Sequence, residues 1–159
     1  KNMNTNKVTR PGKKKSVTKA KKVKGNYYKI ISKSKKTVQY VKPVKKNIIS
    51  VTIPSSIKLN GKRYKVTGIV ANAFKNCKKL KKVTIGTNVN SIGKRTFYGC
   101  SKLRTIKVKT SKLTGSRVGK QAFKGLNKKA VIKVPKKQLK AYKRLFRAKG
   151  VGKKVTIKK

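Results

Sequence analysis

An internal repeat in the middle of this chain constrains its fold more than any other feature. Segments 73–86 (AFKNCKKLKKVTIG) and 96–109 (TFYGCSKLRTIKVK) superpose without a gap. The superposed apolar pairs, all at one constant offset, are Phe74 and Phe97, Cys77 and Cys100, Leu80 and Leu103, Val83 and Ile106, and Ile85 and Val108. Polar residues vary freely between them. This pattern is typical of coils that bury one face against their neighbours, so the sequence predicts a stack of coils, a solenoid.

A third copy covers residues 122–135, where Phe123 takes the place of Phe97. Phe123 lies three residues further from Phe97 than Phe97 lies from Phe74. These three extra residues fall in segment 110–117, where we expect a surface loop to absorb them. One coil alone has too little core, whereas three or four stacked coils bury a continuous one.

A degenerate first copy begins at residues 50–54, where Val51 and Ile53 correspond to Val83 and Ile85 at a longer spacing. The inserted segment 59–64 (LNGKRY) explains that spacing. Its Asn-Gly dipeptide is the strongest short signal for a β-hairpin, so we expect the insertion to fold back on itself.

Each copy contains a short strand with one buried side. The segments VTI, IKV and IKV alternate apolar and polar residues with the period of two that strands require. The residues expected to point inward are Val83, Ile85, Ile106, Val108, Ile132 and Val134. Those expected to point outward are Thr84, Lys107 and Lys133.

The N-terminal flank divides into two parts. Residues 1–25 contain ten Lys or Arg and show no periodicity, which indicates a basic flexible linker or tail. Segments 27–31 (YYKII) and 37–41 (TVQYV) are then typical of two strands of a hairpin. Pro43 should end the second strand because it lacks a backbone donor.

The C-terminal flank predicts one amphipathic helix over residues 136–149. Its apolar residues at helical spacing are Leu139, Tyr142, Leu145 and Phe146. Gly150 stands at a plausible C′ position. Such a helix would cover the open end of the stack, and the closing VTI at 155–157 repeats the strand signature once more.

The charge balance excludes most enzyme chemistry. The chain carries 50 Lys and Arg but no Asp, Glu or His, for a formal charge of +50 over 159 residues. Paired-carboxylate hydrolysis, carboxylate-bound Ca²⁺ or Mg²⁺, and triads that need His or Asp are therefore closed to it. No Gly-Lys dipeptide completes a phosphate-binding G-x-x-x-x-G-K-[ST] loop. We expect no enzyme activity and neither a metal nor another cofactor.

The distribution of apolar residues bears on location. No run of 18 apolar residues exists, so no segment is expected to span a membrane. The chain begins at Lys1 without an apolar signal segment, which indicates a processed product or an excised piece.

Two cysteines occupy equivalent places one coil apart, and Leu126 holds that place in the third copy. Buried free thiols are the favoured interpretation of Cys77 and Cys100. A disulfide and a metal site stay open as alternatives, although two thiolates without His or a third Cys make an incomplete zinc site.

Aromatic residues separate into core and surface candidates. The Phe residues of the three copies keep a fixed repeat phase, so we expect core packing rather than stacking against bases. Tyr98 stands where the other copies have Lys75 and Lys124, and it is the better candidate for an exposed aromatic.

The repeat resembles a known bacterial class. The residues that fill the pattern L-x-x-I-x-I/L-P-x-x-V-x-x-I-G-x-x-A-F-x-G/N-C are Leu80, Val83, Ile85, Val89, Ile92, Gly93, Phe97, Gly99 and Cys100. The pattern is that of the BspA-like (Treponema pallidum-type) leucine-rich repeats of bacterial surface proteins, and the resemblance covers residues 50–135. It implies adhesion, or protein and glycan binding, without catalysis. The chain departs from the family in having no acidic residue.

Together these features predict an α/β fold, a right-handed leucine-rich-repeat solenoid with a parallel β ladder, an N-terminal β-hairpin cap and a C-terminal helical cap. After the tail at 1–25 we expect one repeat domain at 26–159. Within it, residues 26–49 form the hairpin cap, 50–135 the repeats, and 136–159 the helix and terminal strand cap.

The uncompensated charge directs the functional prediction. A charge of +50 on a compact body raises self-repulsion, so a counter-charge is expected where the protein works. We predict a non-enzymatic module, secreted or on the bacterial cell surface, that binds polyanions: teichoic acid, acidic glycan or nucleic acid. Two other functions stay open, an adhesin repeat that binds surface proteins and a nucleic-acid coat or packaging protein assembled on a polyanion. An engineered, supercharged sequence would also explain the missing carboxylates.

Lysine dominates the basic residues, 43 to 7 over arginine. Lysine acts as a point charge, whereas arginine supplies the fork that reads guanine edges, so affinity should follow phosphate density rather than base identity. The predicted polyanion-binding residues are Lys82, Arg104, Lys107 and Lys133 as a stripe across the strands, Lys13, Lys14 and Lys15 in the tail, and Lys140, Lys143, Arg144 and Arg147 on the helix.

Overall fold

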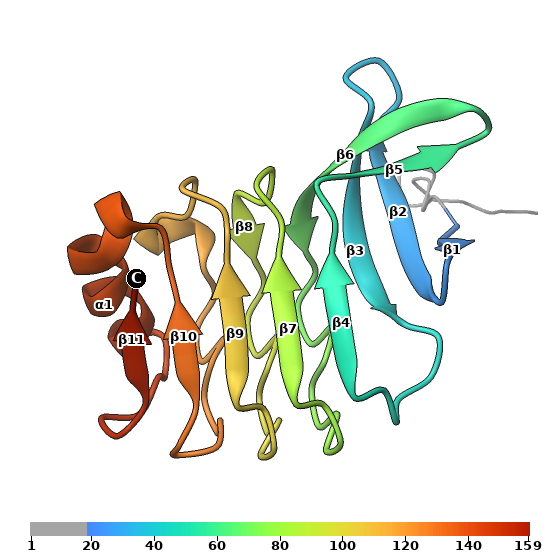
Figure 1. Ribbon diagram of the computed structural model, residues 1–159. Coiled ribbons are helices and arrows are strands. Elements are labelled where there is room, and N and C mark those ends of the chain that lie inside the picture. Colours follow the sequence, from blue (N-terminus) through green and yellow to red (C-terminus); the bar gives the residue numbers. More distant parts are fainter. Residues whose placement is uncertain (1–18) are drawn as a thin grey trace, which may run out of the picture.

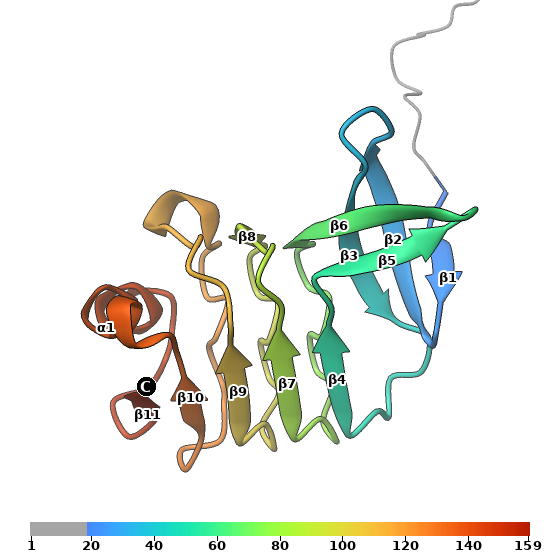
Figure 2. The same ribbon diagram turned by 45° about the horizontal axis from the view of Figure 1, so that its top comes forward.

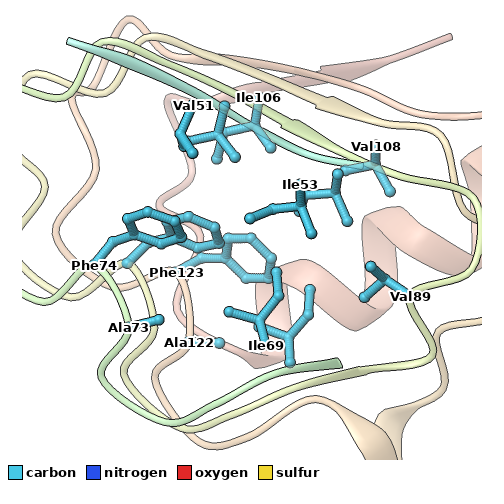
Figure 3. Packing of buried hydrophobic residues seen from close by; sticks show 14 of the residues in the cluster. Val51, Ile53, Ile69, Ala73, Phe74, Val89, Ile106, Val108, Ala122 and Phe123 are labelled. Carbon is cyan, nitrogen blue, oxygen red and sulfur yellow. The ribbon is translucent and has the colours of Figure 1, made fainter. Parts of the chain in front are cut away.

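The computed structural model describes residues 19–159, which form two sheets and a C-terminal helix (Figure 1). A parallel sheet of five strands has the order β11-β10-β9-β7-β4. A second sheet of six strands has the order β1-β2-β3-β6-β5, with β8 also pairing β6. The apolar core lies between the parallel sheet and the turns of the opposite wall (Figure 3).

Each repeat contributes one strand to the parallel sheet. The strands are β4 (Ser50–Ile53), β7 (Lys82–Ile85), β9 (Thr105–Val108), β10 (Val131–Lys133) and β11 (Thr156–Lys158). Their register is the one that the repeat alignment predicts, since Val51 pairs with Val83, Val83 with Ile106, and Ile106 with Ile132. The six residues predicted to point inward are all buried. The closing strand is confirmed too, since Ile157 of β11 pairs with Ile132.

The second sheet begins with the predicted hairpin. β2 (Asn26–Ser32) and β3 (Thr37–Pro43) pair antiparallel, and β3 ends at its proline as expected. β3 also pairs in parallel with β6 (Lys62–Ile69). Figure 2 shows the hairpin strands of this sheet beyond β4, at one end of the parallel sheet. The short β8 (Ser91–Ile92) continues the pairing from β6 into the next coil.

The predicted boundary of the tail at residue 25 is wrong. β1 (Lys21–Val23) pairs antiparallel with β2. Lys24 and Gly25 take positive φ values of 46° and 82°, and this tight turn folds the chain back so that part of the expected tail gains a strand partner. Residues 1–18 lie outside the described residues.

The insertion in the first copy is a hairpin, as its Asn-Gly dipeptide predicts. β5 (Ser56–Leu59) pairs antiparallel with β6. Asn60 and Gly61 both have positive φ, 50° and 75°, which a two-residue hairpin turn of this kind requires.

A row of aromatic rings fills the core along the stack. Phe74, Phe97 and Phe123 are fully buried, and their ring centroids lie 5.4 and 5.5 Å apart. Figure 3 shows the first and last of these rings facing the valines and isoleucines of the sheet. Tyr40 of β3 stacks on Phe74 at 5.1 Å, and Phe146 lies 4.8 Å from Phe123. The hairpin and the helix thus each add one ring, and we call these five residues the aromatic row.

Backbone hydrogen bonds tie the coils together behind this row. The N–H of Phe74 donates to the Thr96 carbonyl at 2.9 Å, that of Phe97 to the Ala122 carbonyl at 2.8 Å, and that of Phe123 to the Lys149 carbonyl at 3.0 Å. Equivalent positions therefore bond to one another from coil to coil, as strands do in the sheet. The stack has a hydrogen-bonded ladder on both sides of its core.

The C-terminal helix is shorter than predicted. A 3₁₀ turn, η3 (Lys136–Gln138), precedes α1 (Leu139–Ala148), because Pro135 holds the chain extended just before it and the first turn closes tightly. Gly150 has a φ of 107°, and the N–H of Val151 donates to the Phe146 carbonyl at 3.0 Å. This Schellman arrangement confirms the predicted C′ glycine.

The three extra residues before the third copy lie in a surface loop, as predicted, and this loop is anchored to α1. The Tyr142 hydroxyl donates to the Thr110 carbonyl at 2.8 Å and accepts the N–H of Leu113 at 3.2 Å. Leu113 is buried, and the 3₁₀ turn η2 (Gly115–Arg117) follows it. The loop therefore packs against α1, which a repeat alignment cannot show because the helix lies outside the repeats.

Both cysteines are free and buried. The Cys100 thiol donates to the Phe74 carbonyl at 3.0 Å. Burial raises the pKa of both thiols; for Cys100, burial and the nearby Cys77 raise the pKa to about 12. Of the interpretations left open by the sequence, the structure has the two free thiols.

Replacing Phe97 with Ala should lower the free energy of unfolding by about 3 to 5 kcal/mol, because it removes a fully buried ring from the middle of the aromatic row and leaves a cavity. Urea unfolding at fixed salt measures the change. Lys107→Ala, at an exposed place on β9, is the control and should stay within about 0.5 kcal/mol of the parent. Equal losses in the two variants would contradict the buried row.

The raised thiol pKa values predict that neither cysteine reacts in the folded protein. The thiolate is the nucleophile, and burial disfavours it, so a maleimide at about pH 8 should label Cys77 and Cys100 only when the chain unfolds. Mass spectrometry after labelling with and without denaturant counts the modified thiols. Fast double labelling without denaturant is the result that this packing does not allow.

Candidate functional site

Outward-facing residues of the parallel sheet form rows that cross the strands. In one row, Lys107 of β9 pairs with Lys133 of β10, which pairs with Lys158 of β11. All three are exposed, and neighbouring strands lie about 4.8 Å apart. The row continues through Thr84 of β7 and Thr52 of β4. We call Lys107, Lys133 and Lys158 the lysine row; strand pairing sets the spacing of their positions.

Lys82 does not belong to this row, so the predicted stripe is wrong in that member. The repeat offset places Lys107 opposite Thr84, whereas Lys82 pairs with Thr105 one row away. Lys158 was not predicted to bind, yet it completes the row because β11 continues the register of β10. The closing strand signature was the sequence signal that could have indicated it.

Arg104 lies in a groove near the start of strand β9. The groove has a volume of about 800 Å³, and its cationic lining residues are Arg104, Lys128, Lys129 and Lys154. Asn127 orders the turn beside it, since its side chain donates to the Ser101 carbonyl at 3.2 Å and accepts the Lys129 N–H at 2.8 Å. We call this the basic groove. Its three lysines precede β10 and β11 in turns, and only the stacking of coils brings them to Arg104.

All four basic residues predicted on the helix are exposed on α1: Lys140, Lys143, Arg144 and Arg147. Arg147 is also engaged by the backbone, since its guanidinium donates to the Gly152 carbonyl and, at 2.8 Å, to that of Val155. It therefore fixes the turn into β11. The tail residues Lys13, Lys14 and Lys15 lie outside the described residues.

No carboxylate side chain offsets these charges, because the chain has no Asp or Glu. Some cations lie against aromatic rings instead. The Lys42 Nζ lies 5.9 Å from the Tyr27 centroid, and Tyr98 has the Lys75 Nζ at 6.0 Å and the Arg95 guanidinium at 5.9 Å. Tyr98, which was predicted to be an exposed aromatic, is half-buried, and these two cations lie near its ring.

Within residues 19–159, no three His, Cys, Asp or Glu side chains gather as metal ligands would. Both thiols are buried and have no imidazole partner in a chain that lacks His. None of the helices in this part of the chain has the length and apolar character that a membrane crossing needs.

Solved structures share this fold. A leucine rich cell surface protein from Faecalibacterium prausnitzii A2-165 superposes with a TM-score of 0.57 at 20% identity, over 75% of this chain and 37% of its own. A leucine-rich repeat protein from Bacteroides ovatus ATCC 8483 gives 0.51 at 22% identity, over 72% and 37%. A third, from Bacteroides capillosus ATCC 29799, gives 0.58 at 21% identity, over 87% and 97%. The chain thus spans little more than a third of the first two proteins, and the likeness concerns the fold.

The sequence itself matches a family. Curated proteins give no match. The BspA type leucine rich repeat region, in six copies, matches residues 44–159. This range is longer than the predicted 50–135 and takes in α1 and β11, in agreement with the place of β11 in the parallel sheet. The chain belongs to the BspA-type leucine-rich repeat family.

Proposed function

We propose that this domain is a non-enzymatic binding module of a secreted or cell-surface protein, and that it binds polyanions through the lysine row and the basic groove. The lysine row carries the proposal. Three cations stand in register on neighbouring strands, in a chain with no Asp or Glu side chain to neutralise them. A polymer with regularly spaced anionic groups supplies the missing counter-charges along the same direction.

The basic groove extends the same surface. Arg104 precedes Lys107 by three residues on one coil, a distance of about 10 Å along an extended chain. Lys129 and Lys154 likewise come just before β10 and β11. The lysine row and the basic groove therefore serve the same three strands. A polymer that crosses these strands can bind both.

The ligand class follows from the type of cation. Lysines make up the whole row and three of the four cations of the groove. Because lysine offers a point charge, teichoic acid, acidic glycans and nucleic acid should be distinguished by charge density and not by base sequence. The cell-surface designation of a structural neighbour and the family of the chain support a location outside the cell.

The ends of the stack are part of the proposal. In a right-handed solenoid, the hairpin and the helix would act as the N-terminal and C-terminal caps. Tyr40 and Phe146 support this role, since each covers one end of the aromatic row. Capped ends leave the sheet surface and its cations as the main binding face.

Polyanion affinity should fall steeply with salt. If about six anionic groups are neutralised, counterion release weakens binding by roughly 10³-fold between 50 and 200 mM salt. Fluorescence titration with heparin, teichoic acid, single-stranded DNA and duplex DNA at both salt levels measures this. Strong preference for one DNA sequence, or a salt-independent affinity for an uncharged glycan, would contradict the proposal and favour the protein-adhesin function.

Changing Lys107, Lys133 and Lys158 to Glu should weaken heparin binding at least tenfold more than a control of equal charge. The control changes Lys33, Lys35 and Lys45, which are exposed near the hairpin and outside the row and groove. With duplex DNA as the ligand, each phosphate that the variant no longer neutralises should also flatten the slope of log affinity against log salt by about 0.9. If both triple variants bind equally, only the net charge matters, and the lysine row is not the site.

A further inference from the structure

We infer that the open edge of β4 binds an extended peptide segment rich in acidic residues, which would join the parallel sheet as an added strand. This site lies at the opposite end of the sheet from the lysine row and does not depend on polyanion binding. Its partner is another protein chain, recognised through its backbone and its negative side chains.

The first support is the unpaired backbone of β4. In the parallel sheet this strand pairs with β7 alone. The Ile49 carbonyl accepts the N–H groups of Lys81 at 2.7 Å and Lys82 at 3.3 Å, which fixes which residues face β7. Since alternate residues of a parallel strand bond to opposite sides, Ser50 and Thr52 direct their N–H and carbonyl groups to the open edge. Both residues are exposed.

The second support is the space beside this edge. A groove of about 780 Å³ runs between β4, the β1–β2 turn and β5. Its apolar lining residues are Val23, Tyr28, Ile48, Val51, Pro54 and Ile57. Figure 1 shows β4 as the end strand of the parallel sheet, with β1 and β2 beyond it. An added strand would find backbone partners on one side and apolar contacts for alternate side chains.

The third support is charge, which selects the occupant. Lys24, Lys58 and Arg63 line the groove, and the Arg63 Nη1 donates to the Ser56 hydroxyl at 3.0 Å. No acidic residue exists in the chain to pair with them. A second copy would bring a charge of +50, and residues 1–18 carry six Lys or Arg without an acid, so charge disfavours both. An acidic partner is the complementary choice.

The test uses the full 159-residue chain and a synthetic peptide of about eight residues that alternates valine and glutamate. Binding is measured at about 150 mM salt, where the Debye length is near 8 Å and remote charges are screened. A second peptide has the same sequence with every other backbone nitrogen methylated, which keeps the charge and removes the ladder donors. We expect the methylated peptide to bind at least tenfold more weakly.

Two substitutions at one position separate the backbone from the side chain. Thr52→Pro removes a donor that faces the open edge, at a strand edge where proline is tolerated. It should weaken the alternating peptide at least tenfold, whereas Thr52→Val keeps the N–H and should stay within about twofold. Circular dichroism and the melting temperature check that both variants fold. Amide NMR shifts caused by the peptide should centre on Ser50, Thr52 and the groove.

Several outcomes would overturn the inference. Equal affinity for the methylated and unmethylated peptides would show attraction by charge alone. Shifts centred on the lysine row would place the peptide at the other end of the sheet. A dimer in sedimentation equilibrium that Thr52→Pro dissociates would identify a second copy as the occupant. Failure of the polyanion proposal shows instead in the lysine-row variants, so the two results are distinguishable.

Discussion

Stacking of one aromatic ring per coil sets the register in which the other residues of this domain lie. The aromatic row advances by 4.8 to 5.5 Å from ring to ring, close to the spacing of about 4.8 Å between strands. The spacing between successive coils is therefore nearly the same in the core and in the sheet. Because of this common spacing, equivalent residues of successive coils also align on the outer face. The alignment of the lysine row thus depends on the packing of the buried rings.

The repeats made most of this fold predictable from sequence, and apart from the place of Lys82 the failures lie where repetition ends. Phe97 and its equivalents, the inward strand residues and the Asn-Gly hairpin were all predicted, because a pattern that recurs in each copy identifies its buried positions. Tyr40 and Phe146 complete the row from elements without the motif, so only their contacts show the role. β1 is three residues long and exists through its pairing with β2, and the exposed Arg147 is held by two carbonyls that no local pattern places beside it.

The like charges of the lysine row repel one another, and the free energy gained by burying the core exceeds this repulsion. Two unit charges about 4.8 Å apart in water repel by roughly 0.9 kcal/mol, and flexible lysine stems splay to reduce this. Burial of one Phe side chain contributes about 1.5 to 3 kcal/mol. The fold can therefore carry adjacent like charges at ordinary salt. An anion placed between two lysines changes the sign of their contribution, so the same row that weakens the free domain strengthens a complex.

The two edges of the parallel sheet manage their unpaired backbone in different ways. β11 is three residues long, ends in the exposed Lys158 and follows the lysines of its turn, and short, lysine-bearing edges resist pairing with another chain. β4 is longer and presents uncharged Ser50 and Thr52 beside an apolar groove. Two copies meeting edge to edge would bring like charges together at either end. Charge repulsion therefore disfavours pairing of the β4 edge with a second copy of this chain. A strand that carries negative charge does not meet this repulsion.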